Sequence, residues 1–299
     1  MSECKVSLSI GRMQIYFGDE EAIRHAKAVG ADAVDFDLLR YDDTLYKKSD
    51  DEVLSHIEKV AKVARSVGIE IGQTHGRITG YRNIPEYDAE QKRMARLDLM
   101  ATRILGCRHC VMHGPSSIFF GANADPQMMR DLAFRNFCDF LPFARENGVK
   151  IATETFGDAT GVGCIDFFGD ADEFVNIFER IAAVPGNAEN FCCCMDTGHT
   201  NKAYRFPGEP SPGDLIRRLG KRIEVLHLND NNKLTDQHKV PRSGDIDWAD
   251  VMQALAEIGY DGIYNMELVL THFGKSPEMV LAYAEFAVKV MRELLAEYR

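Results

Sequence analysis

Several short apolar runs of the sequence end in a side chain that can bind a metal ion or transfer a proton. The runs read IGQTHG, CVMHG, IATETF, CCCMDTGH, VLHLND and IYNMEL, and they place such side chains at His75, His113, Glu154, Asp196, His227 and Glu267. One ending of this kind is uninformative, but six in series are hard to explain by packing alone. The pattern predicts a single site assembled from strand ends that are far apart in the sequence.

Four of these residues form the strongest set, because they combine three carboxylates with one imidazole: Glu154, Asp196, His227 and Glu267. Hard oxygen ligands with one nitrogen suit Mn²⁺, Mg²⁺, Co²⁺ or Zn²⁺ and disfavour soft metals. Ionised carboxylates gathered at one buried point would repel each other without a cation. We therefore expect these four residues to bind a divalent ion, with Mn²⁺ as the first choice.

Further polar residues accompany this set, and their types leave more than one role open. His199 follows Asp196 by three residues, and Asp236 and His238 form an Asp-x-His pair in a later loop. Each could support a ligand, contact a substrate or bind an additional metal ion. His75 and His113 could likewise hydrogen-bond a substrate hydroxyl or bind an additional ion.

The elements that must position these residues follow a regular alternation of β-rich runs and amphipathic runs. The pattern predicts strands over 5–10, 33–38, 69–74, 110–113, 150–155, 191–196, 224–228 and 262–267. It predicts helices over 20–29, 51–67, 89–105, 128–146, 171–181, 214–219, 248–258 and 277–298. Alternating strands and helices imply parallel pairing through right-handed crossovers. Eight such units predict a (β/α)8 barrel, with residues 1–299 as one domain and the site at the C-terminal strand ends.

The lengths of the loops also place the site at the C-terminal ends of the strands. Glycines follow five of the predicted helices, at Gly30, Gly68, Gly106, Gly148 and Gly259, where a left-handed C-cap favours glycine. The phrases around them predict short turns from helix to strand. The loops from strand to helix are longer, as expected for the face that carries an active site.

Composition narrows the class of protein. The chain has 299 residues, 45% of them hydrophobic, and a formal net charge of −11. An acidic protein repels nucleic acid and anionic membranes at long range. We see no signal peptide and no run of the roughly 18 apolar residues that a membrane helix needs. The eight cysteines lack Cys-x-x-Cys spacing, so we expect reduced thiols and a cytoplasmic location.

The order Glu154, Asp196-Thr197-Gly198-His199, His227, Asp236-Gln237-His238 and Glu267 resembles the xylose-isomerase-like TIM-barrel superfamily. This group includes sugar phosphate isomerases and epimerases, ketose 3-epimerases, inosose dehydratases and endonuclease IV. The segment DQHKVPRSGDIDWADVMQALAEIGYDGIYNMEL is especially typical. The resemblance spans the whole predicted barrel, and its motifs are specific for the superfamily but weak for the reaction.

Resemblance to the ketose epimerases implies that Glu154, Asp196, His227 and Glu267 are the metal ligands and that His199 contacts the substrate. It also implies a mechanism in which the metal chelates a carbonyl and a neighbouring hydroxyl and stabilises an enediolate. Glu154 and Glu267 would be the catalytic pair, one removing and the other returning a proton. The expected function is that of a metal-dependent sugar, sugar phosphate or cyclitol isomerase or epimerase, with a small carbohydrate as substrate.

Endonuclease IV supplies the alternative, since that family binds three zinc ions through nine ligands. All nine have a match here: His75, His113, Glu154, Asp196, His199, His227, Asp236, His238 and Glu267. This resemblance implies a trinuclear phosphodiesterase acting on abasic DNA. The acidic charge and the scarcity of clustered Lys and Arg disfavour DNA, and MHGPS and TETFG depart from the endonuclease phrases.

A third hypothesis is a barrel that binds sugar or metal without turnover. The sequence does not choose among epimerase, isomerase, dehydratase and lyase, because all begin with proton removal beside a carbonyl. Aromatic residues in the predicted rim loops fit sugar stacking, and they equally fit self-association into a homo-oligomer.

Overall fold

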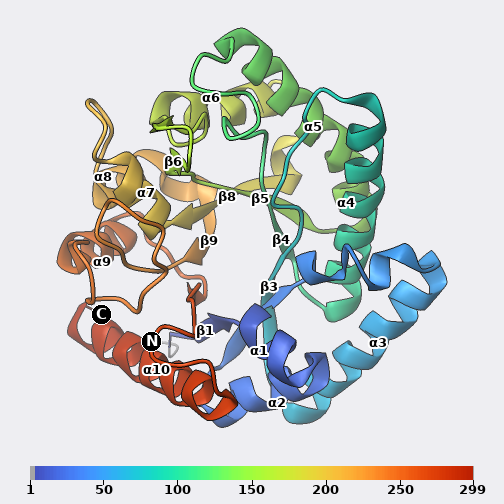
Figure 1. Cartoon of the computed structure of the whole chain (residues 1–299), viewed down its shortest axis with the longest axis vertical. Helices are drawn as coiled ribbons and strands as arrows, with labels where there is room; N and C mark the ends of the chain where they lie inside the picture. The colour runs from blue at the N-terminus through green and yellow to red at the C-terminus, as the bar shows by residue number, and fades with distance from the viewer. Residues whose placement is uncertain (1–3, 299) are drawn as a thin grey trace.

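The computed structural model describes residues 4–298 and shows eight parallel strands surrounded by helices (Figure 1). The strands are β1 (Val6–Ser9), β2 (Ala33–Asp37), β3 (Glu70–His75), β4 (His109–Met112), β5 (Lys150–Glu154), β8 (Phe191–Asp196), β9 (Ile223–His227) and β10 (Tyr264–Met266). Their order in the sheet is β10-β1-β2-β3-β4-β5-β8-β9. A parallel bridge between Leu228 and Met266 joins the two ends of this order. The predicted (β/α)8 barrel is therefore confirmed.

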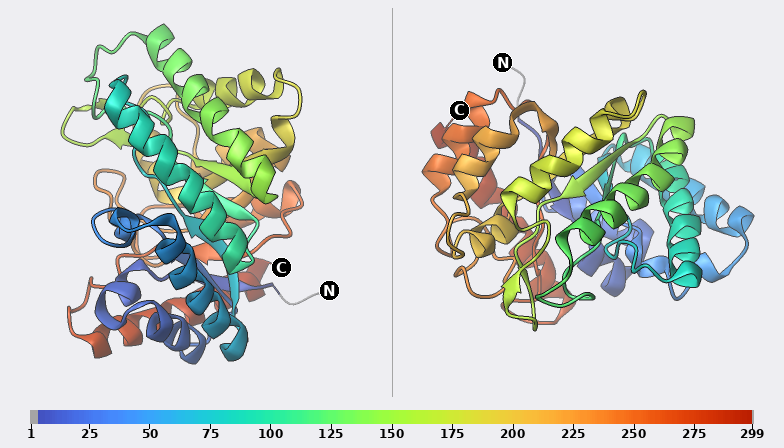
Figure 2. Two further views of the ribbon diagram at one scale, coloured as in Figure 1. Left: turned by 90° about the vertical axis from the view of Figure 1, so that its right-hand side faces the viewer. Right: turned by 90° about the horizontal axis from the view of Figure 1, so that it is seen from above.

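Helices connect successive strands and cover the outside of the barrel (Figures 1 and 2). They are α1 (Gly11–Phe17), α2 (Asp19–Ala28), α3 (Asp50–Val67), α4 (Pro85–Leu105), α5 (Pro126–Asn147), α6 (Ala171–Ala182), α7 (Thr197–Ala203), α8 (Pro212–Leu219), α9 (Trp248–Glu257) and α10 (Pro277–Tyr298). Side-chain caps fix several of their starts. Ser49 and Glu52 form a reciprocal capping box at the start of α3, which satisfies amide groups that the first turn leaves unpaired.

The five predicted C-cap glycines all have positive φ, between 64° and 93°. The predicted helix stops are therefore correct. Two short helices, α1 and α7, were not predicted, because seven residues with a glycine show little helical periodicity. The loop after β5 also contains a small antiparallel hairpin, β6 (Asp158–Ala159) with β7 (Cys164–Ile165). Both unpredicted helices follow a strand directly, at the face where the strands end.

The core has two parts, as expected for a barrel. A large cluster lies between the strands and the surrounding helices, and a small one consists of residues from β4, β5, β8 and β9. The small cluster contains Val111, Ala152, Cys192, Cys194 and Val225. The adjacent cysteines therefore serve as small apolar side chains, and their thiols are free. Among residues 4–298, we find no helix that is both long and apolar enough to cross a bilayer.

Candidate metal centre and active site

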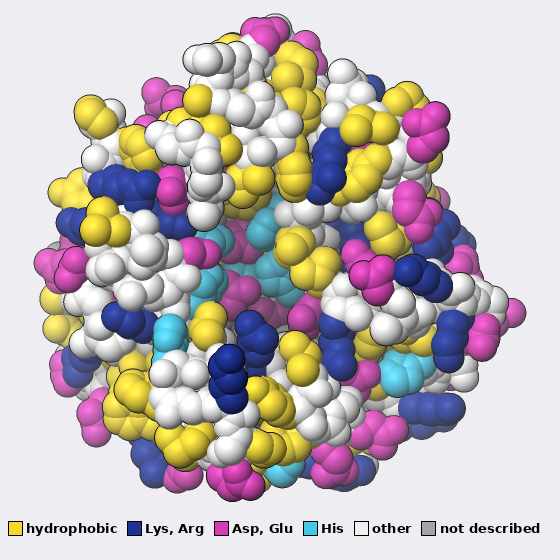
Figure 3. Space-filling model, viewed as in Figure 1, with side chains coloured by type: hydrophobic (Ala, Val, Ile, Leu, Met, Phe, Trp, Pro, Cys, Tyr) yellow, Lys and Arg dark blue, Asp and Glu magenta, His cyan; other side chains and the backbone are white. Residues whose placement is uncertain are grey.

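A hollow at the C-terminal ends of the strands collects histidine and carboxylate side chains (Figure 3). The cavity has a volume of about 530 Å³. Its wall includes seven of the nine residues singled out in the sequence, namely His75, His113, Glu154, His199, Asp236, His238 and Glu267. The other two, Asp196 and His227, are fully buried and adjoin them. The structure thus brings all nine together.

Glu154, Asp196, His227 and Glu267 form a compact group whose ligand atoms lie within 4.8 Å of one another. The Nδ1 atom of His227 is 3.2 Å from Oε2 of Glu154 and 3.3 Å from Oε2 of Glu267. Three of the side chains are fully buried, whereas that of Glu267 is 21% exposed. Glu267 therefore lies between the buried ligands and the open cavity.

The start of α7 explains how Asp196 is held in place. Asp196 is the N-cap of this helix, and its Oδ1 accepts a hydrogen bond of 2.6 Å from the backbone amide of His199. Its Oδ2 accepts a second bond, 2.8 Å long, from Nδ2 of Asn229. A Cβ atom on Gly198 would lie 1.8 Å from Oδ1 of Asn229. Glycine in the Asp-Thr-Gly-His phrase therefore lets Asn229 reach the carboxylate.

Two histidines from neighbouring strands approach the carboxylate of Glu154. The Nε2 atom of His113 is 2.9 Å from Oε2 of Glu154, and Nε2 of His75 is 3.5 Å from the same oxygen. Nε2 of His75 is also 3.7 Å from Oε1 of Glu267. Glu154 is thus placed between the two strand-end histidines and His227.

A second group contains His199, Asp236 and His238, whose ligand atoms also lie within 4.8 Å of one another. Oδ2 of Asp236 is 3.4 Å from Nε2 of His199 and 3.2 Å from Nε2 of His238. The Nδ1 atom of His199 lies 3.1 Å from Oε1 of Glu154. His199 therefore links Asp236 to Glu154 of the first group.

The sequence analysis missed one residue of the centre, Asp35 on β2. This side chain is buried, and its Oδ2 lies 3.3 Å from Nε2 of His227. The same oxygen accepts a hydrogen bond of 2.6 Å from the hydroxyl of Ser9. The phrase AVDFD holds two acids that alternate with apolar residues on a predicted strand, which was a usable signal. Carboxylates that contact the far nitrogen of a ligating histidine fix its tautomer and orientation.

A model of the xylose isomerase-like TIM barrel family matches residues 23–292. The chain belongs to this family. A D-psicose 3-epimerase of Enterocloster bolteae is 26% identical over 202 residues, which cover 68% of this chain and 60% of that protein. A fructoselysine 3-epimerase of Escherichia coli O157:H7 is 31% identical over 80 residues, covering 27% of this chain and 28% of its own length. These matches thus span less than two thirds of the curated relatives.

Solved structures of family members share the fold over nearly the whole chain. A D-tagatose 3-epimerase-like protein superposes with a TM-score of 0.74 at 19% identity and covers 98% of both chains. A D-psicose 3-epimerase crystallised in the presence of D-fructose gives a TM-score of 0.74 at 18% identity, covering 97% of this chain and 99% of its own. At this identity the likeness shows the fold alone.

The electrostatics of this family member's centre are dominated by burial and by charge pairing. Burial alone would raise the pKa of Glu154, but His227 and His113 outweigh it and hold that pKa well below its ordinary value. Burial opposes charge on His75, yet Glu154 and Glu267 raise its pKa to about 9. Asp196 differs, because burial and the neighbouring Glu154 raise its pKa to about 6 although His199 opposes the shift. The protonation state of each of these side chains therefore depends on the charges of its neighbours.

Orphaned buried atoms show that a cation fits the first group. Oε1 of Glu154 and Nδ1 of His227 are buried, and neither has a hydrogen bond of acceptable geometry among the described residues. Buried polar atoms normally have a partner, and an unsatisfied one is costly. Three carboxylates and an imidazole are a suitable donor set for a hard or borderline divalent ion. Glu154, Asp196, His227 and Glu267 are therefore the residues that would hold it.

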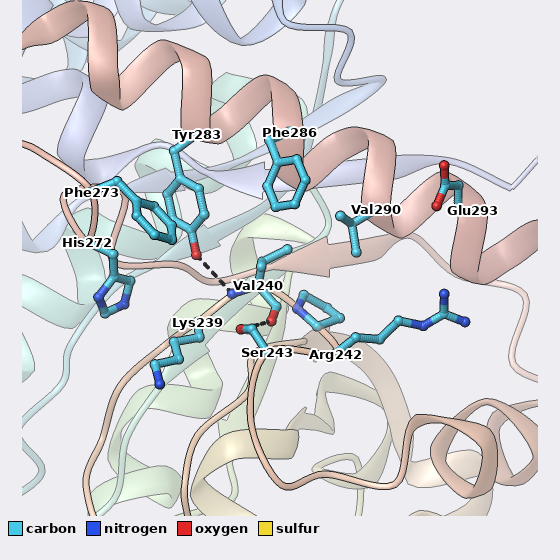
Figure 4. A pocket seen from close by; sticks show the side chains of 11 residues that line it. Lys239, Val240, Arg242, Ser243, His272, Phe273, Tyr283, Phe286, Val290 and Glu293 are labelled. Carbon is cyan, nitrogen blue, oxygen red and sulfur yellow. Dashed lines mark hydrogen bonds between the residues drawn. The ribbon is translucent and has the colours of Figure 1, made fainter.

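A second cavity of about 600 Å³ lies between α10 and residues 239–243, the segment that follows His238 in the chain (Figure 4). Aromatic side chains from α10 and the preceding loop line it, including Phe273, Tyr283 and Phe286. The Tyr283 hydroxyl accepts a 3.0 Å hydrogen bond from the amide of Val240, which ties α10 to this loop. The groups of possible metal ligands lie elsewhere among the described residues, so we assign the chemistry to the strand-end cavity.

Proposed function

We propose that the protein is a divalent-metal-dependent epimerase or isomerase of a ketose or a related sugar. The observation that carries the proposal is the compact group of Glu154, Asp196, His227 and Glu267 at the strand ends of the barrel. The names of the relatives support the sugar chemistry, since D-psicose and fructoselysine 3-epimerases are among them. The catalytic roles are our inference from the site.

A divalent ion bound there would act as a Lewis acid on the sugar carbonyl and on the adjacent hydroxyl. Glu154 and Glu267 are the proposed acid–base pair, because each carboxylate faces the cavity that would hold the substrate. The surrounding imidazoles hold the pKa of Glu154 below its ordinary value, so its carboxylate is in the ionised form that can accept a proton. Epimerisation needs one group to remove the proton and another to return it on the opposite face. His199, His75 and His113 are the proposed contacts to sugar hydroxyls.

The direct test is exchange of the proton beside the carbonyl with solvent deuterium, measured by NMR with D-fructose or D-psicose and saturating Mn²⁺. We expect exchange in the wild type and its loss in Glu154→Gln and Glu267→Gln. The matched control is Glu146→Gln on the exposed surface of α5, which should exchange at the wild-type rate. Metal content is measured alongside, so that a lost ion is distinguished from a lost base. Retained exchange in both metal-loaded variants would remove the two-base proposal.

The second candidate is a trinuclear zinc phosphodiesterase acting on abasic DNA, and the group of His199, Asp236 and His238 favours it. Against it, Arg12 is the single Lys or Arg among the described residues that line the cavity, whereas DNA binding relies on cationic contacts to phosphate. Metal analysis separates the two candidates. About three zinc ions per chain together with incision of abasic DNA would overturn our ranking, while about one ion with sugar exchange supports it.

A further inference from the structure

The wall of the strand-end cavity carries one permanent cation among many acids. Among the described residues that line it, Arg12 is the only Lys or Arg. The carboxylates of the same wall are Asp35, Asp37, Glu154, Asp236 and Glu267. A divalent ion would offset part of this negative charge, but an anionic ligand would still be repelled unless a cation met it.

Arg12 is also without a partner, unlike other cations near the strand ends. Within residues 4–298, its guanidinium makes no hydrogen bond, ion pair or ring contact. By contrast, Arg77 is buried and bonds to Asp98 at 2.6 Å. Lys202 is similarly buried and lies 2.8 Å from Asp158. The donors of Arg12 are therefore free to bind a ligand in the cavity.

The short helix α1 places this arginine at the lip. It follows β1 directly and therefore lies at the strand-end face (Figure 1). Arg12 and Ile15 are three residues apart, which puts them on one side of the helix, and both line the cavity. Ile15 is 58% exposed, and Ile78 from the loop after β3 is 38% exposed in the same wall. The lip thus offers an apolar surface and a free guanidinium, whereas the floor offers acids and imidazoles.

We propose that Arg12 selects substrates that carry a carboxylate or phosphate at the end of the sugar remote from the metal ligands. This inference rests on the proposed function, because it takes that function's ketose as the body of the ligand. The planar guanidinium binds both anions through two parallel hydrogen bonds. A neutral sugar gains nothing from this group, so the ratio of anionic to neutral binding reports on Arg12 itself.

The test compares three ligands on the Mn²⁺-loaded protein by calorimetry: D-fructose, D-fructose 6-phosphate and D-fructuronate. We expect the wild type to bind at least one anionic ketose more tightly than D-fructose. Arg12→Gln should weaken that anionic ligand about ten- to hundred-fold, the range for a charged hydrogen bond, and change D-fructose binding less than about two-fold. Which ligand responds distinguishes the phosphate from the carboxylate.

Two further variants sharpen this comparison. Arg12→Lys keeps the charge but not the paired donors, so it should retain only part of the preference. Arg65→Gln removes an exposed arginine in the last turn of α3, at the opposite end of the helix from its Ser49 cap, and should behave as the wild type. The inference fails if neither anionic ketose is preferred, or if Arg12→Gln leaves the preference intact.

Solvent exchange at the carbon beside the carbonyl, measured on the same proteins, separates this failure from failure of the proposed function. Exchange with no effect of Arg12→Gln on ligand preference would refute the role of Arg12 alone. A preference that depends on Arg12 without exchange of any of the three ketoses would refute the proposed reaction and keep the anion site.

Discussion

Substitution of Asp35 by Asn should weaken metal binding although Asp35 is not one of the expected ligands. Its Oδ2 faces Nε2 of His227 at 3.3 Å, on the side of the ring opposite to the nitrogen that faces Glu154 and Glu267. The carboxylate favours a proton on Nε2 and so keeps the lone pair of Nδ1 available for an ion. Asn has nearly the same shape but no charge, so this preference is reduced.

Loss of a carboxylate that contacts a metal-binding histidine typically weakens metal affinity about ten- to hundred-fold, or about 1.4–2.8 kcal/mol. We expect a loss of this size for Asp35→Asn. The matched control is Asp37→Asn. Asp37 lies two residues further along β2 and lines the same cavity, but among the described residues it forms no ion pair with His227. Both variants remove one negative charge near the site, and only Asp35→Asn removes the contact with His227.

Calorimetric titration of the metal-stripped proteins with Mn²⁺ and with Zn²⁺ measures the effect, with circular dichroism to verify folding. We expect Asp35→Asn to bind about ten- to hundred-fold more weakly and Asp37→Asn to stay within about three-fold of the wild type, the difference that a through-space charge leaves in a screened cavity. Equal losses in the two variants would mean that only net charge matters. An unchanged affinity in Asp35→Asn would refute the role assigned to the His227 contact.

Two further predictions concern stability and the Asp-Thr-Gly-His phrase. His109 and Lys150 outweigh burial and lower the pKa of Glu224 to about 2, so its stabilisation is complete above pH 4.5 and disappears as the pH falls toward 2. In urea titrations, Glu224→Gln should lose about 1–2 kcal/mol at pH 7, after allowance for partial exposure. Near pH 2 the loss should shrink to a few tenths of a kcal/mol, roughly, because the carboxylate is then half protonated in the folded state. A difference that does not change with pH would contradict this. Gly198→Ala should lower the free energy of unfolding by about 1–3 kcal/mol and weaken Mn²⁺ binding, because the added methyl group would displace Asn229. A variant with unchanged metal affinity would show that Asn229 does not position Asp196.

The sequence predicted the barrel and the convergence of its strand ends because both follow from local patterns. Apolar runs that alternate with amphipathic runs specify the order of the elements, and a closed parallel sheet brings the ends of its strands to one face. His75, His113 and Glu154 lie at the ends of three successive strands of the sheet, so their proximity follows once the fold is known. The same reasoning applies to the other strand-end residues.

Features that depend on side-chain direction across the barrel could not be predicted in this way. Asp35 lies inside a strand, and its burial and its contact with His227, which distinguish it from Asp37 two residues later, appear only in the folded structure. The helix α7 was missed because its start depends on Asp196 accepting a bond from the amide of His199. Periodicity does not reveal a capping contact that is itself part of the centre.

The relation between the two groups of ligands explains why the reaction cannot be deduced from the floor of the cavity alone. Glu154 lies 3.2 Å from His227 in the first group and 3.1 Å from His199 in the second, through its two different oxygens. One carboxylate therefore connects both groups, and a floor of this kind is compatible with one ion or with several. The residues at the lip of the cavity do distinguish between the two candidate ligands. A polyanionic strand of DNA needs many cationic contacts, whereas a small sugar acid needs one. Among the described residues, the cavity wall has a single free guanidinium and five carboxylates, which matches the smaller ligand.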